Sequence, residues 1–92
     1  MLTIKYESKM KRQMRLMVKR GKNPSELIAV LDILAKEQPL PPQYRDHKLS
    51  GRLNAYRECH IKPDWLLIYK IIRNELVLVA SATGSHADLF GQ

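Results

Sequence analysis

The sequence predicts an α+β sandwich in which a helical hairpin packs on one face of an antiparallel sheet. Residues 8–38 carry apolar side chains at helical spacing, residues 53–82 form short apolar segments separated by turns, and residues 2–6 alternate as a strand does. The predicted order of elements is β-α-α-β-β-β with a short C-terminal tail. At 92 residues, the chain is expected to form a single domain spanning 1–92.

The first helix is expected directly after the strand at 2–6. Ser8 is suited to cap its start. Met10, Met14 and Met17 recur at four and three residues, which places them on one helical face. We interpret these methionines as core residues instead of ligands. Gly21 suits the left-handed turn that ends such a helix.

The second helix has clear boundary signals at both ends. Asn23 can cap it, Pro24 fits the first helical position, and Glu26 completes a capping-box pattern. Pro39 cannot continue a helix, so the helix is expected to end near residue 38. The residues expected on its buried stripe are Leu27, Ile28, Leu31 and Leu34.

Three strands are expected after a proline-rich connection. Their predicted ranges are 53–60, 65–72 and 75–82. The middle strand is nearly all apolar and is therefore expected at the centre of the sheet. Arg73 and Asn74 supply a tight turn, which makes the three strands an antiparallel meander. Ser85 and Asp88 then form a weak capping-box pattern before a short helical end.

The charge distribution favours a polyanionic partner. Sixteen Lys and Arg against nine Asp and Glu give a formal net charge of +7. Such a balance is typical of proteins that meet nucleic acid, an acidic protein or an anionic membrane surface. Residues 9–22 include many basic residues and no acidic residue. We expect this segment to be either a solvated helix face or a surface that binds a nucleic-acid backbone. The basic residues of this segment are Lys9, Lys11, Arg12, Arg15, Lys19, Arg20 and Lys22.

Cysteine usage and hydropathy indicate the compartment. The lone Cys59 excludes an internal disulfide and fits a reducing cytosol. The longest apolar run, 65–72, is interrupted by Lys70 and is too short to span a membrane. No apolar stretch follows basic residues at the amino terminus, so a secretory signal is not expected. We therefore expect a soluble, cytoplasmic protein with no membrane partner.

Three histidines lie at the edges of predicted elements. His47 precedes the meander, His60 closes its first strand, and His86 follows its last strand. Asp64 opens the strand after His60, and these two residues are expected to be close in space because they flank one turn. Convergence of the other histidines on the same end of the sheet is compatible with the sequence but not required by it.

Paired imidazoles are suited to the cleavage of RNA. One can take the proton from a ribose 2′-hydroxyl while another protonates the departing 5′-oxygen, so no metal is required. Arg57, Lys48 and Lys62 are candidates for a cation that offsets charge on the phosphorus. The alternative interpretations are surface or structural histidines, and a zinc site, although the compact ligand spacing of such sites is missing. We expect no metal and no cofactor.

Three segments carry a family resemblance: Asp46-His47-x-Leu49-x-Gly51, the block from Tyr56 to Lys70 (YRECHIKPDWLLIYK), and the ending from Thr83 to Phe90 (TGSHADLF). Through them the chain resembles the YafQ-like members of the RelE superfamily of toxin–antitoxin toxins. The basic N-terminal half matches in layout more than in residues. The resemblance implies a RelE-like sandwich of the order given above.

The resemblance also implies an activity and partners. Such toxins are endoribonucleases (mRNA interferases) of type II toxin–antitoxin systems that cleave messenger RNA in the A site of the 70S ribosome. A cognate antitoxin suppresses them, and operator DNA is bound only through the antitoxin complex. The family's catalytic residues match His47, His60, Asp64 and His86, and Phe90 matches the residue linked to holding the message. Ala82 departs from the pattern, because several relatives carry arginine there.

Two other functions share this fold and charge. The chain could be a non-catalytic basic module that binds an antitoxin and operator DNA, or a ParE-like gyrase poison. The histidine set argues against the gyrase poison, which has no evident need for acid–base groups at these positions. Cleavage of RNA on translating ribosomes would distinguish an enzyme from both.

Overall fold

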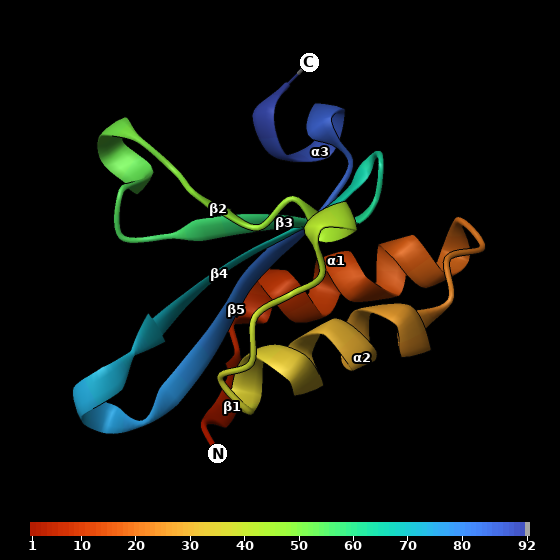
Figure 1. Ribbon diagram of the computed structural model, residues 1–92. Helices are drawn as coiled ribbons and strands as arrows, with labels where there is room; N and C mark the ends of the chain where they lie inside the picture. Colours follow the sequence, from red (N-terminus) through yellow and green to blue (C-terminus); the bar gives the residue numbers. More distant parts are fainter. Residues whose placement is uncertain (92) are drawn as a thin grey trace.

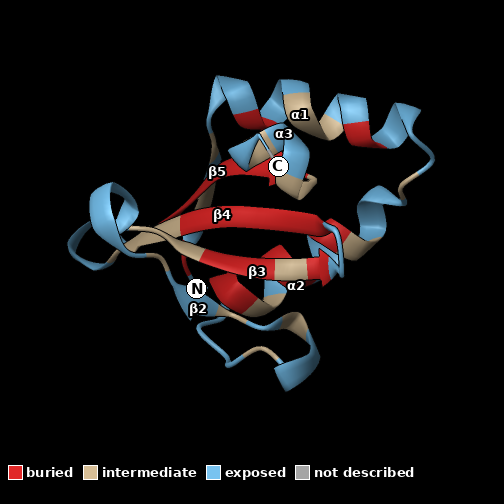
Figure 2. Ribbon diagram, turned by 90° about the horizontal axis from the view of Figure 1, so that it is seen from above, coloured by how far each residue is buried: buried red, intermediate tan, exposed pale blue. Residues whose placement is uncertain are grey.

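The computed structural model describes residues 1–91, and Gln92 lies outside the described residues. Five strands form one sheet in the order β1-β5-β4-β3-β2. The strands are β1 (Thr3–Tyr6), β2 (His47–Lys48), β3 (Arg57–Lys62), β4 (Trp65–Ile72) and β5 (Val77–Gly84), and the helices are α1 (Ser8–Lys19), α2 (Pro24–Ala35) and α3 (His86–Phe90). Figures 1 and 2 place α2 on one side of the sheet and α3 on the other. The predicted fold class is confirmed.

The sheet is mixed because of the position of β1. Strands β3, β4 and β5 form the predicted antiparallel meander. Strand β1 pairs in parallel with β5, with Thr3 opposite Val77 and Tyr6 opposite Ala80. The helical hairpin carries the chain away from β1, so the partner of β1 comes from the far end of the sequence. The expectation of a wholly antiparallel sheet was therefore wrong at this one pair.

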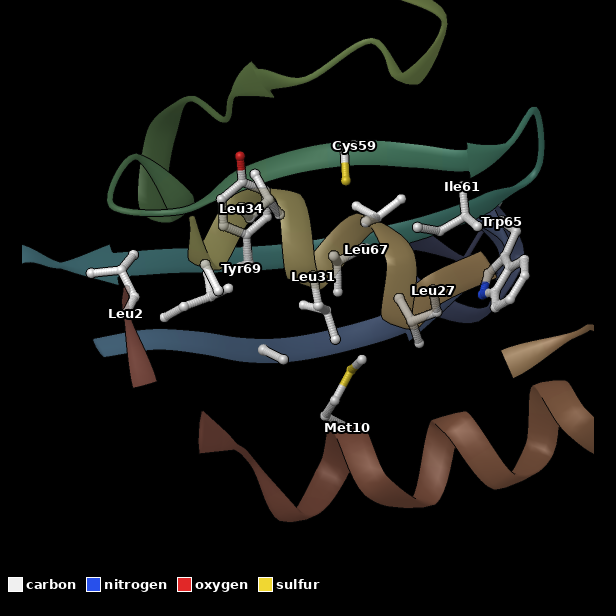
Figure 3. Packing of buried hydrophobic residues seen from close by; sticks show 14 of the residues in the cluster. Leu2, Met10, Leu27, Leu31, Leu34, Cys59, Ile61, Trp65, Leu67 and Tyr69 are labelled. Carbon is white, nitrogen blue, oxygen red and sulfur yellow. The ribbon is translucent and has the colours of Figure 1, made fainter. Parts of the chain in front are cut away.

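The hydrophobic core lies between the sheet and the helical hairpin (Figure 3). Met10 and Met17 are buried and Met14 packs against the core, which confirms the prediction for the three methionines. Helix α2 and strand β4 supply most of the other members. These are Leu27, Val30, Leu31, Leu34 and Ala35 from α2, and Trp65, Leu67 and Tyr69 from β4. Burying each large side chain contributes roughly 1.5–3 kcal/mol.

Strand β4 is buried along most of its length (Figure 2), which confirms its predicted central position. Ile28 on α2 was predicted to be buried but is 52% exposed. The reason is geometric: Leu27, Leu31 and Leu34 define the stripe that faces the sheet, and Ile28 lies outside its border. Burial raises the pKa of the Cys59 thiol, so this cysteine is unreactive.

Two of the four predicted N-terminal caps are confirmed, and Gly21 has the left-handed conformation expected after α1, with a φ of 88°. Asn23 Oδ1 accepts a hydrogen bond from the Ser25 amide at 3.0 Å, and α3 has the reciprocal capping box of its predicted pair. The other two predictions were wrong. Glu7 occupies the N-cap position of α1, which makes Ser8 the first helical residue. Glu26 forms an ion pair with Lys62 of β3 at 3.1 Å, and this contact uses the carboxylate that a capping box would need.

Two strands begin and end later than predicted. Strand β3 starts at Arg57 and β5 at Val77, because Gly51–Leu53 and Arg73–Glu75 form single 3₁₀ turns. Leu76 follows the second turn with a φ of 56°, a left-handed conformation that no sequence signal marked. No helix within residues 1–91 is long and apolar enough to cross a membrane.

Candidate active site

The three histidines converge on one end of the sheet. His47 comes from the edge strand β2, His60 from β3, and His86 from the first position of α3. The ring centroids of His47 and His60 are 6.3 Å apart, and those of His60 and His86 are 5.8 Å apart. The convergence that the sequence left open therefore occurs, with His60 in the middle.

A buried carboxylate lies between two of these rings. Glu58 Oε1 is 3.5 Å from His47 Nε2 and 3.6 Å from His60 Nε2, and the Glu58 side chain is only 8% exposed. The register explains the arrangement, because His47 is paired with Glu58, and Glu58 and His60 share one face of β3. A carboxylate withdrawn from water can balance a positive charge on either imidazole. Sequence reasoning missed Glu58, and its two-residue spacing from His60 was the available signal.

Asp64 orients the third histidine. Its Oδ1 accepts a hydrogen bond from the His86 amide at 2.9 Å and is 2.7 Å from His86 Nδ1. These contacts, the amide first and the ring second, lower the pKa of the Asp64 carboxyl. His60 lies at the same turn as Asp64, as the sequence predicted, but its Nδ1 faces the Pro63 carbonyl at 3.3 Å. The aspartate is thus directed to His86.

Backbone carbonyls contact Nδ1 of the other two rings. His47 Nδ1 lies 2.7 Å from the Arg45 carbonyl, and His60 Nδ1 faces the carbonyl of Pro63. A carbonyl oxygen only accepts hydrogen bonds, so each of these contacts is a hydrogen bond when Nδ1 carries the proton. The Nε2 atoms of both rings are then the ones that face Glu58. Every histidine of the site is therefore held through Nδ1, and proton exchange is left to Nε2.

A hollow of about 450 Å³ lies between α1, α3 and the sheet. Phe90, at the end of α3, lines it and is 38% exposed. Ala82, the residue that departs from the family pattern, lines the hollow too. Lys9 also lines it and supplies a cation there. The other lining residues are Glu7, Gln13, Leu53, Tyr56, Ile68, Ser81, Asp88 and Leu89.

The three cations expected near the histidines have other surroundings. Arg57 binds Asp46 through two hydrogen bonds of 3.3 Å, and it belongs to the face of β3 that carries the buried Cys59. Lys62 is paired with Glu26 of α2. Lys48 is exposed on β2, where it is paired with Arg57. The structure therefore brings His47, His60, Asp64 and His86 together, and of these cations Lys62 lines a hollow together with His60.

The basic segment of α1 and the turn after it is largely on the surface. Lys22 is half-buried, and Arg20 forms an ion pair with Asp88 of α3. Arg20 is exposed like the other five members, namely Lys9, Lys11, Arg12, Arg15 and Lys19. Among residues 1–91, no group of three or more His, Cys, Asp or Glu side chains is arranged to hold a metal ion.

Comparison with known proteins shows the family of this chain. The family model of the bacterial toxin YafQ, of type II toxin–antitoxin systems, matches residues 2–91. The chain belongs to the YafQ family. Among the YafQ proteins, the mRNA interferase toxin YafQ of Escherichia coli K12 is 38% identical over 89 residues, which cover 96% of this chain and 95% of the relative.

Solved structures agree with the YafQ assignment. A metal-bound toxin from Helicobacter pylori has a TM-score of 0.93 and 46% identity, and the match covers 98% of this chain and 100% of that one. A chain of the E. coli DinJ–YafQ complex has a TM-score of 0.89 and 36% identity, covering 99% and 100%. Both the family resemblance and the fold expected from it are confirmed.

Proposed function

We propose that this YafQ-family toxin is an endoribonuclease that cleaves messenger RNA by metal-independent acid–base catalysis. One observation carries the proposal: three histidines meet at one end of the sheet, the ring centroids of neighbouring pairs lying 6.3 Å and 5.8 Å apart, with Glu58 between two of them and Asp64 on the third. The site thus holds two carboxylate–imidazole pairs, Glu58 with His60 and Asp64 with His86. Such pairs are the groups needed to move protons at a phosphodiester whose nucleophile is its own 2′-hydroxyl.

The reaction follows from these pairs. One imidazole removes the 2′-hydroxyl proton as that oxygen attacks phosphorus, and the bond from phosphorus to the 5′-oxygen breaks. A second imidazole gives its proton to the departing 5′-oxygen. The products are a 2′,3′-cyclic phosphate and a free 5′-hydroxyl, so atoms and charge balance without water in this step. The ring centroids of His60 and His86, 5.8 Å apart, allow the two rings to flank a single phosphodiester.

The surroundings of the histidines suit a nucleotide chain. The hollow beside α3 offers the aromatic face of Phe90 for stacking a base. Lys9 in the same hollow is the cation we assign to charge on the phosphate, in place of the arginine that relatives carry at position 82. Among the cations named from the sequence, Arg57 and Lys62 are already paired with carboxylates.

We further propose the partners that this activity requires. The exposed cations of α1 would track ribosomal RNA phosphates and present the toxin to the message in the A site. A cognate antitoxin would bind the toxin and suppress it, and operator DNA would be reached through that complex. The E. coli DinJ–YafQ complex supports the antitoxin as a partner. A net charge of +7 suits an acidic antitoxin segment.

The test maps 5′ ends on a reporter message in a translating extract that receives antitoxin-free toxin. Wild type is compared with His86→Ala and with Asn74→Ala, a control in an exposed turn. We expect cuts inside the A-site codon in wild type and control, reduced about 10²–10⁴-fold in His86→Ala. A single 2′-deoxynucleotide 5′ of the cut should abolish cleavage, and the upstream product should end in a cyclic phosphate.

Four outcomes would contradict the proposal. Cleavage that persists in His86→Ala would remove this histidine from the chemistry. Cleavage of the deoxy-substituted message would exclude attack by the 2′-hydroxyl. A folded toxin that cuts no message would favour the binding module, and DNA damage with intact messages would favour a gyrase poison.

A further inference from the structure

A bidentate ion pair joins the end of α1 to α3. Arg20 Nη1 lies 2.5 Å from Asp88 Oδ2, and Nη2 lies 3.0 Å from Asp88 Oδ1. The two residues are 68 positions apart in the chain. Parallel guanidinium–carboxylate bonds of this kind fix the relative orientation of the two groups as well as their distance. The pair therefore restrains α3 against the long helix.

Helix α3 depends on such restraints. It is five residues long, and no residue of this helix, all of which the structure describes, is buried. A helix this short is not stable alone, so contacts outside it must hold it in place. The proposed chemistry uses both of its ends, because His86 occupies the first position and Phe90 the last. A displacement of α3 would move both residues together.

Asp88 is the point through which α3 is held. Its Oδ2 accepts a hydrogen bond from the Ser85 amide at 2.8 Å, while its own amide donates to Ser85 Oγ at 3.1 Å. Arg20, followed by the Ser85 amide, lowers the pKa of the Asp88 carboxyl well below its ordinary value. Gly84 leaves room for this arrangement, since a Cβ at that position would lie 2.9 Å from the Asp88 Cβ. The Asp88 carboxylate thus caps the start of α3 and links this helix to α1.

We propose that Arg20 is a positioning residue for RNA cleavage. Through Asp88 it holds α3 so that His86 stays beside His60 and Phe90 stays in the hollow. The inference rests on the proposed function, because it concerns the rate of the same reaction. It also separates Arg20 from its neighbours in the basic segment: both Arg20 and Lys19 are exposed, but the Arg20 guanidinium is paired with Asp88 of α3, whereas Lys19 forms no such pair within residues 1–91 and can meet phosphates.

The first experiment separates positioning from binding. Single-turnover cleavage of a message on purified ribosomes gives a maximal rate and a half-saturating toxin concentration for wild type, Arg20→Met, Asp88→Asn, the double variant and Lys19→Met. We expect Arg20→Met to lower the maximal rate about 10-fold or more with little change in half-saturation, since misplaced catalytic groups lose rate steeply. Lys19→Met removes the same charge and should raise half-saturation instead.

The double variant tests whether Arg20 acts through Asp88. The Asp88→Asn substitution keeps a side-chain oxygen that can cap α3 but removes the charge. We therefore expect Arg20→Met to cost nothing further in the Asp88→Asn background. Arg20→Lys should recover part of the rate, because a single ammonium replaces one arm of the fork. Losses that multiply in the double variant would overturn the proposal, as would an Arg20→Met variant that behaves like Lys19→Met.

A second measurement does not depend on cleavage. The ring resonances of His86 and Phe90 in the free toxin should shift or broaden in Arg20→Met, while those of Tyr44, which lines a different hollow from Phe90, stay in place. Unmoved His86 and Phe90 resonances would overturn the proposal even if activity fell. If wild-type toxin cleaves no message, the proposed function fails, and the spectra still decide whether Arg20 restrains α3.

Discussion

The hydroxyl of Thr83 offers the sharpest test of the packing beneath the site. Thr83 is 1% exposed, accepts a hydrogen bond from Trp65 Nε1 at 3.0 Å and donates one to the Leu66 carbonyl at 2.6 Å. Trp65 is itself 1% exposed. Thr83→Val keeps the shape of the side chain and removes both bonds, which leaves the indole N–H buried without its acceptor.

The loss in free energy of unfolding caused by Thr83→Val can be worked out from these contacts. A buried donor that loses its acceptor costs about 1–3 kcal/mol, and the second lost bond adds about 0.5–1.5 kcal/mol. We therefore expect Thr83→Val to lower the free energy of unfolding by roughly 2–4 kcal/mol. For a domain of this size, each 1 kcal/mol corresponds to a Tm shift of about 4–8 °C.

Urea denaturation followed by tryptophan fluorescence measures the change directly, because Trp65 is the single tryptophan of the chain. Thr83→Ser is the matched control: it keeps the hydroxyl and removes one methyl, which should cost about 1 kcal/mol. The reasoning would be refuted if the valine variant were as stable as the serine variant, because the hydrogen bonds would then contribute nothing beyond packing.

Two further predictions concern the carboxylates of the site. Glu58→Gln keeps the volume but removes the charge facing His47 and His60, and we expect single-turnover cleavage to fall roughly 10²-fold with a normal melting curve; an unchanged rate would exclude a role for this charge. Contacts with His86 hold the pKa of Asp64 below its ordinary value of 3.8, so the stability they add is present above that value and is lost as the pH falls through the lowered one. Asp64→Asn should therefore be less stable than wild type at about pH 6 and converge with it towards about pH 2, and a constant difference in unfolding free energy across that range would contradict the assignment.

Local signals in the sequence were sufficient for the helices and the meander. Asn23 marks where α2 begins, and the apolar run from Trp65 to Ile72 marks the central strand. Helix α2 ends at Ala35, before residue 38, where Pro39 had led us to expect its end. Each of these signals acts over a few neighbouring residues. The parallel pairing of β1 with β5 joins Thr3 to Val77, near the two ends of the chain, and no short-range pattern in the sequence encodes it.

The candidate site, too, was only partly predictable from local sequence signals. Histidines and Asp64 were found because they lie at strand ends, where their chemistry stands out from the surrounding apolar residues. Glu58 was missed because an acidic residue in a strand is ordinarily expected in solvent, and only the pairing of His47 with Glu58 shows that it is enclosed. The ion pair of Arg20 was equally hidden, since a basic side chain in a basic segment looks solvated until α3 is placed beside it.

Because β2 is short, the part of the site that it carries is less stable than the rest of the chain. His47 stands on a two-residue strand at the edge of the sheet, held by its register with Arg57 and Glu58, whereas His60 follows on a strand that is paired along its length with β4. Edge segments with few ladder bonds open locally at a small fraction of the global unfolding free energy. Amide hydrogens around residue 47 should therefore exchange with solvent long before those of β4. Under the proposed function, heat would then disable cleavage below the temperature at which the core melts, and cooling would restore it.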